Sequence, residues 1–172
     1  MEIARRRSPE AEFRVGSLFG VGIPPCAAVT AISEVLNYLF DVENEERGPG
    51  RLFRRVHDAL DPGGLFVFDA LGPGQVRPGD RKRGFRVGED WAVLSELEED
   101  AGRDTMERRI VSFRKVGAHY RRDEEVHRVR LYDPAELSAE LERAGFRVST
   151  MRSYGDLPLE EGHTAFVARK PV

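Results

Sequence analysis

The sequence of 172 residues contains one cysteine, one tryptophan and no long apolar run. Cys26 has no second cysteine to pair with, which excludes a scaffold of internal disulfides. No apolar stretch approaches the roughly 18 residues of a membrane span, and none follows the basic residues 5–7 as a signal peptide requires. We therefore expect a soluble, cytoplasmic protein with no membrane partner.

Lysine is also scarce, because 24 of the 27 basic residues are arginine. Guanidinium groups suit anion recognition, but a GC-rich genome produces the same bias. We favour the second reading, because the arginines are dispersed among acidic residues and the net charge is -3. That charge, with no basic face carrying interleaved aromatics, argues against a nucleic-acid partner.

Two further kinds of site find no support in the sequence. A metal site is not expected, because the four histidines lack close ligand spacing with Cys26 or with each other. Serine hydrolysis is not expected either, because Ser17, Ser33 and Ser95 lack the turn that exposes a nucleophilic serine.

Two short apolar runs, residues 27–32 and 65–70, have the pattern of strands covered on both faces, as in a parallel sheet. Residues 51–60 between them place Leu52, Phe53 and Val56 on one helical stripe. The turn Asp61-Pro62-Gly63-Gly64 follows. Together they predict a strand, helix, strand crossover.

The remaining segments complete a mixed pattern of helices and strands. Asp133 and Glu136 form the start signal of a helix that Gly145 ends. In the first half of the chain, the other expected elements are a helix at 2–7, a short strand at 12–18 and a mobile loop at 72–84. After the loop we expect antiparallel strands with one solvent-exposed face at 86–97, 106–116 and 120–132, and closing strands at 146–154 and 163–169. This is an α/β three-layer domain, in which ligands bind beyond the carboxyl ends of the parallel strands.

Six segments in this order resemble the class I S-adenosylmethionine-dependent methyltransferases of the small-molecule type. They are EIAR at 2–5, FRVGSL at 13–18, AVTAISEVLNYL at 28–39, LDPGGLFVFD at 60–69, AGF at 144–146 and FVARKP at 166–171. The resemblance implies a partial Rossmann-like three-layer methyltransferase fold, with an antiparallel β cap inserted after the fifth strand. The partial core would comprise residues 1–84, the cap 85–132 and the C-terminal part of the core 133–172.

The family's glycine-rich turn after strand one and the carboxylate that ends strand two have no counterpart here. The family's sheet order, 3-2-1-4-5-7-6, would place the two missing strands in the middle. Strands three and four would then lie some 14 Å apart, given about 4.8 Å between neighbouring strands. We therefore expect an N-terminally truncated chain whose Met1 is an internal methionine of the family pattern.

The resemblance implies S-adenosyl-L-methionine as cofactor and assigns residues around it. The expected cofactor-binding residues are Ser17, Leu18, Ala31, Ile32 and Ser33. The competing interpretation is that these residues only end a strand or pack in the core, because such residues look the same in the sequence.

Asn37 and Tyr38 fall where the family's helix faces the substrate, so both are candidates for substrate binding. Transfer of a methyl group to oxygen or nitrogen requires removal of a proton near neutral pH. Tyr38 and His127 are the expected catalytic residues, and His119 and Tyr120 are also candidate bases. Surface histidines and packed tyrosines are the competing interpretations.

The expected function is methyl transfer from S-adenosylmethionine to a small-molecule acceptor, an activity that truncation could remove. The alternative is a non-catalytic remnant that serves as a binding or interaction module. Unpaired strand edges at the gap would favour a homo-oligomer.

Overall fold

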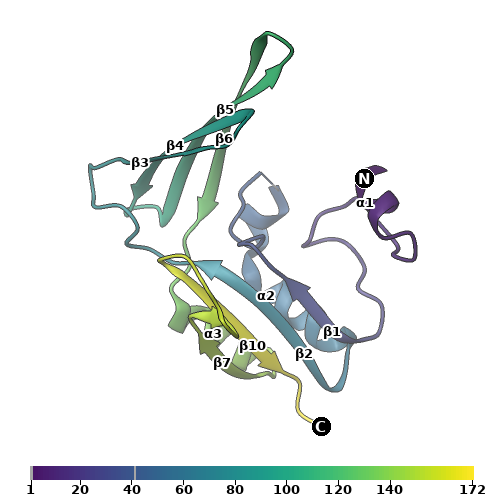
Figure 1. Ribbon diagram of the computed structural model, residues 1–172. Helices are drawn as coiled ribbons and strands as arrows, with labels where there is room; N and C mark the ends of the chain where they lie inside the picture. The colour runs from purple at the N-terminus through teal and green to yellow at the C-terminus, as the bar shows by residue number, and fades with distance from the viewer. Residues whose placement is uncertain (1, 41) are drawn as a thin grey trace.

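The computed structural model describes residues 2–40 and 42–172, which form a core and a projecting antiparallel sheet (Figure 1). The core sheet has four strands in the order β1-β2-β10-β7. Its strands are β1 (Cys26–Ala31), β2 (Leu60–Leu71), β7 (Arg147–Met151) and β10 (His163–Arg169). Along the chain, β7 and β10 are separated by a small hairpin of β8 (Ser153–Tyr154) with β9 (Leu157–Pro158).

The predicted crossover is confirmed, because β1 pairs with β2 in parallel and α2 (Val42–Ala59) connects them. This helix is broken at Gly48, whose φ of 59° and ψ of 171° are not helical. Its continuous part, with Leu52, Phe53 and Val56 buried, agrees with the predicted stripe. The following turn is a bulge inside β2, since Cys26 pairs with Leu60 but Ala28 pairs with Leu65.

The core lies between the sheet and the two helices α2 and α3 (Pro134–Arg143). Its centre is Phe68, whose ring stacks on Phe66 and Phe166 at centroid distances of 4.6 and 4.7 Å. Helix α3 begins as predicted, with the Asp133 carboxylate accepting hydrogen bonds from the N–H groups of Ala135 and Glu136. The binary pattern thus located the hydrophobic centre of the protein.

Two expectations about the first part of the chain are wrong. Residues 12–18 form no strand, and Val15 is 84% exposed because no neighbouring strand pairs with it. Strand β1 is an edge strand that pairs only with β2 among the described strands, so its residues Ala27, Ala28 and Thr30 are exposed. The predicted helix near the N-terminus, α1 (Glu2–Arg7), is present and has no buried residue.

The turn at 17–21 is held by α2 instead of by a sheet. The guanidinium of Arg55 donates hydrogen bonds to the carbonyl oxygens of Leu18, Phe19 and Val21. Phe19 is buried in the core beside this contact. Side-chain donors therefore replace the strand pairing that the alternation at 12–18 suggested.

The cap is a four-stranded antiparallel sheet of consecutive strands (Figure 1). Its strands are β3 (Lys82–Val87), β4 (Trp91–Asp100), β5 (Thr105–Val116) and β6 (His119–Arg130). The segment at 86–97, predicted as one strand, contains the end of β3, a turn that begins at Gly88 and most of β4. The prediction of a single strand is wrong, because it passes over this turn. The sheet extends from Lys82 to Arg130, where we expected a cap at 85–132.

The loop before the cap is anchored at its start. The buried carboxylate of Glu99 accepts hydrogen bonds from the N–H groups of Gly74, Gln75 and Val76. Beyond these contacts, β3 already begins at Lys82, within the segment expected to be mobile.

The cap joins the core through a short backbone bridge and a small apolar cluster. Tyr38 pairs with Val129 of β6, and Leu71, Met106 and Leu131 pack beside that strand. No helix in the described part of the chain is long and apolar enough to cross a membrane.

Candidate active site

The chain turns sharply where β1 ends. Ser33 and Glu34 have positive φ angles of 71° and 50°, which non-glycine residues adopt rarely and at an energetic cost. The carboxylate of Asp69, on β2, accepts hydrogen bonds from both backbone N–H groups at 2.7 and 2.9 Å. The Tyr154 phenol donates to the same carboxylate at 3.1 Å. Asp69 therefore stabilises a strained turn at the edge of the sheet where the parallel strands end.

This turn directs the Glu34 carboxylate into the junction between core and cap. Arg108 of β5 binds it with both terminal nitrogens, at 2.6 and 3.3 Å, and His163 Nε2 of β10 lies 3.1 Å from Oε2. Burial disfavours the charged carboxylate, but its hydrogen bonds to His163 and Arg108 outweigh this and lower the pKa of Glu34 to about 2. The hydrogen bond to Glu34 raises the pKa of His163.

Tyr38 lies beside this ion pair and contacts His127. Burial and the negative charge of Glu34 raise the pKa of the Tyr38 phenol, while Arg108 opposes that effect. The rings of Tyr38 and His127 meet edge to face at a centroid distance of 5.6 Å. His127 Nε2 lies 3.0 Å from Glu125 Oε2, and its buried Nδ1 has no partner among the described residues.

A cavity of about 460 Å³ opens at the carboxyl end of β1. Its walls come from the turn held by Arg55, from the end of β1 and from residues 32–40, which connect β1 to α2. The lining residues are Gly16, Leu18, Phe19, Thr30, Ala31, Ile32, Val35, Tyr38 and Phe40. None of these described lining residues is charged, so the cavity suits an apolar or aromatic group.

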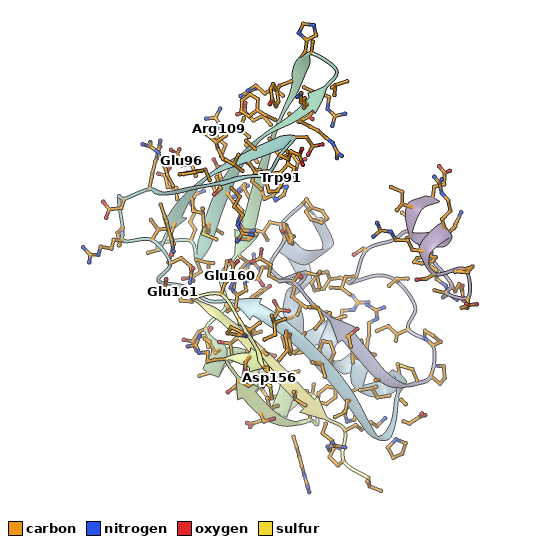
Figure 2. All side chains as sticks on the ribbon, in the orientation of Figure 1. Trp91, Glu96, Arg109, Asp156, Glu160 and Glu161 are labelled. Atoms are coloured by element: carbon orange, nitrogen blue, oxygen red, sulfur yellow. The ribbon has the colours of Figure 1, made fainter. Side chains whose placement is uncertain are left out.

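A second, smaller cavity of about 200 Å³ lies between cap and core. Arg108 and His163, the two partners of Glu34, both line it. Figure 2 shows Glu160 and Glu161, which also line it, at the junction between the two sheets. Glu34 and its partners thus connect the wall of the first cavity, at Tyr38, with the wall of the second.

The structure brings together four of the residues expected at the site. Leu18, Ala31, Ile32 and Tyr38 line the same cavity, and His127 contacts Tyr38.

Three other expected residues do not line that cavity. The Ser17 hydroxyl accepts a hydrogen bond from the Phe19 N–H in its own turn. Ser33 contributes its backbone N–H to Asp69. Asn37 is fully buried, and its amide bonds to the backbone of Leu71 and Arg130. The candidate bases His119 and Tyr120 begin β6, which is the far end of the cap hairpin.

Sequence reasoning assigned no role to Glu34, Arg108 or His163. Glu34 and Asp69 stand at the ends of two predicted strands, and that position was the available signal. Nothing local distinguishes Arg108 from 23 other arginines, since its role depends on a contact across 74 residues. Within the described residues, no group of three His, Cys, Asp or Glu side chains is placed to hold a metal ion.

No protein-family model and no curated protein matches the sequence. Solved structures do resemble it. An S-adenosylmethionine-dependent methyltransferase from Clostridium acetobutylicum is 17% identical, with a TM-score of 0.79 over 99% of this chain and 70% of that chain. A methyltransferase of amino pentoses from Micromonospora echinaspora, involved in calicheamicin biosynthesis and solved with S-adenosylmethionine bound, is 18% identical, with a TM-score of 0.74 over 98% of this chain and 69% of that chain.

A sugar N-methyltransferase from Streptoalloteichus is also similar, at 18% identity and a TM-score of 0.72 over 99% of this chain and 67% of that chain. Together these likenesses show that the chain has the α/β fold of the S-adenosylmethionine-dependent methyltransferases. The strand order β1-β2-β10-β7 corresponds to strands four, five, seven and six of the order expected from the sequence.

Proposed function

We propose that this protein binds S-adenosyl-L-methionine at the end of β1 and transfers its methyl group to a small-molecule acceptor. The observation that carries the proposal is the convergence of Leu18, Ala31, Ile32 and Tyr38 on one cavity. These residues lie at the carboxyl end of a parallel strand, where ligands bind in sheets of this kind. The shared fold of the similar structures supports the same function.

The cavity fits the apolar parts of this cofactor. Its volume of about 460 Å³ lies within the usual range for small-molecule sites, and Leu18, Ala31 and Ile32 present apolar surface. Thr30 adds the side-chain hydroxyl of a residue on the exposed edge strand. Because no charged residue belongs to the described lining, the charged end of the cofactor would extend beyond it.

When bound, the cofactor would supply a methyl group carried on a sulfonium, which a nucleophilic oxygen or nitrogen of the acceptor would take as the S–C bond breaks. The protein contributes alignment and exclusion of water. Tyr38 stands at the cavity wall, and its raised pKa keeps the phenol protonated, so that its hydroxyl oxygen can accept a hydrogen bond from the acceptor while Glu34 holds its proton.

His127 is the proposed proton acceptor. Glu125 holds Nε2 at 3.0 Å, which leaves the Nδ1 lone pair to take the proton that the acceptor loses. Because Nδ1 is buried and His127 does not line the cavity, the imidazole has to turn past the Tyr38 ring to reach the acceptor. No described residue bonds this Nδ1. We assign the acceptor side of the site to Tyr38 and His127, while Asn37 holds cap and core together through its three backbone contacts.

Formation of S-adenosylhomocysteine from S-adenosylmethionine, in the presence of a panel of small amines, alcohols and phenols, tests the proposal. Thr30→Trp should fill the cavity and abolish turnover, whereas Ala28→Trp is its control, because Ala28 is exposed on the same strand and does not line the cavity. Equal turnover by both variants would contradict the assignment of this cavity.

One exposed apolar patch on the cap favours the second candidate function, an interaction module. Phe85, Val87 and Leu94 are exposed on one face of the cap, where a shallow cavity of about 580 Å³ lies. Exposed apolar patches commonly mark protein interfaces, including those of homo-oligomers. A folded protein that binds neither cofactor nor its product, but self-associates in light scattering, would favour this candidate.

A further inference from the structure

Arg108 belongs to the cap but has its partner in the core. Its two terminal nitrogens lie 2.6 and 3.3 Å from the two carboxylate oxygens of Glu34. Both side chains are largely buried, with exposed fractions of 20% and 9%. A paired guanidinium and carboxylate of this kind fixes orientation as well as charge.

The neighbouring arginine on the same strand provides a contrast. Arg109 is more than half exposed and pairs with Glu124 of the adjacent cap strand. Successive side chains of a strand point to opposite faces, so Arg108 faces the core and Arg109 faces away from it. Figure 2 shows Arg109 and Glu96 on the cap, away from the core sheet. The chain thus directs one particular arginine into the junction.

Three features indicate that the position of Glu34 matters for more than stability. Its backbone has a strained positive φ of 50°, and Asp69 holds that conformation. Such strain is concentrated at functional sites. In addition, Glu34 and Arg108 both act electrostatically on Tyr38, which lines the cofactor cavity.

We propose that Arg108 is a positioning residue, which acts through Glu34 to hold the Tyr38 phenol at the cavity wall and to fix the cap over it. This inference rests on the proposed function, since it assigns Tyr38 to the acceptor side of the site. Arg108 itself touches neither cofactor nor acceptor in this account. It aligns the cap, which bears His127, with the core, which bears the cofactor cavity.

The test compares Arg108→Gln with Arg109→Gln, and includes Arg108→Lys as the conservative variant. Arg108→Gln should lower kcat about tenfold or more with the KM for S-adenosylmethionine nearly unchanged, because alignment is lost while the cofactor cavity remains. Arg109→Gln should keep both parameters. Arg108→Lys should recover part of kcat, since it retains the charge but not the paired geometry.

A spectroscopic measurement separates this inference from the proposed function. In NMR spectra of ring-labelled tyrosine, the Tyr38 signal should move in Arg108→Gln and stay in place in Arg109→Gln. If the unaltered protein transfers no methyl group, the proposed function fails, while the Tyr38 signal still decides the role of Arg108. An unchanged Tyr38 signal together with an unchanged kcat would overturn the inference.

Arg108→Gln leaves Glu34 buried with less compensation and so could unfold the junction. The double variant Glu34→Gln/Arg108→Gln removes both charges and is expected to fold. It should show the same displaced Tyr38 signal and the same loss of kcat. A folded double variant with the kcat and Tyr38 signal of the unaltered protein would equally overturn the inference.

Discussion

Asn37 and Leu71 are joined by two hydrogen bonds. Asn37 Nδ2 donates to the Leu71 carbonyl at 2.9 Å, and the Leu71 N–H donates to Asn37 Oδ1 at 3.1 Å. Nδ2 also donates to the carbonyl of Arg130, at the end of the cap. One buried amide thus satisfies backbone groups at the end of β2 and at the end of β6, where the cap returns to the core.

Replacement of Asn37 by alanine should lower the free energy of unfolding by about 3 kcal/mol, because buried backbone groups at Leu71 and Arg130 lose their partners. Urea denaturation measures the change. Ser149→Ala is the control, since the Ser149 hydroxyl makes an exposed contact of 3.5 Å, and its effect should stay within about 0.5 kcal/mol. Equal effects would contradict the role assigned to Asn37.

Glu99→Ala should release the start of the loop before the cap. The Glu99 carboxylate accepts three hydrogen bonds, from Gly74, Gln75 and Val76, and its loss leaves these N–H groups free to exchange. Hydrogen exchange of the three amides should accelerate clearly. Glu98→Ala removes only an exposed ion pair with Arg81 and should leave them protected. Persistent protection in Glu99→Ala would show that other contacts hold the loop.

Stability should depend on pH through Glu34 and His163. The pKa of Glu34 is lowered to about 2, so its contribution is present above the ordinary value of 4.5 and is lost as the pH falls towards 2. The pKa of His163 is raised above 6.5, so its contribution is present below 6.5 and is lost as the pH rises through the higher value. The free energy of unfolding should therefore be highest between these limits.

Urea denaturation across the pH range measures both effects. Glu34 faces Arg108 and His163, and His163 also interacts electrostatically with Asp69, so the two contributions share one contact and the two single substitutions should differ in which limb they change. His163→Gln should remove the decline above pH 6.5 that this histidine causes, and Glu34→Gln should weaken both declines. An unaltered profile in both variants would contradict this assignment.

Phe68→Ala should destabilise the core by about 4 kcal/mol. Its ring is fully buried between Phe66 and Phe166, so truncation removes apolar contact and leaves a cavity. Phe85→Ala serves as the matched control, because Phe85 is 77% exposed on the cap, and should change stability by less than about 0.5 kcal/mol. Calorimetric or urea unfolding distinguishes the two, and comparable effects would contradict the position of the core.

Much of the fold follows from the local pattern of the sequence. The run of small and branched residues at 27–32, the stripe of Leu52 and Phe53 and the start signal at Asp133 all form the predicted elements. These features depend on neighbouring residues, so the sequence displays them directly. The exposed edge of β1 could not be read from the pattern, because burial depends on which strands pair beside it.

The candidate site could be predicted only in part for the same reason. Ala31, Ile32 and Tyr38 occupy one strand end and the turn after it, so a resemblance over a short segment places them together. Arg108 and His163 reach Glu34 from positions 74 and 129 residues away. Contacts at such separation depend on strand order and register across two sheets, and no local pattern of charge reveals them.

Calorimetric titration of the folded protein with S-adenosylhomocysteine, the product of the proposed reaction, tests the proposed cofactor site most directly. We expect binding in the micromolar range that Thr30→Trp abolishes and Ala28→Trp retains, because Thr30 lines the cavity and Ala28 does not. Circular dichroism confirms that each variant is folded. Absence of binding by the folded, unaltered protein would contradict the proposed cofactor site.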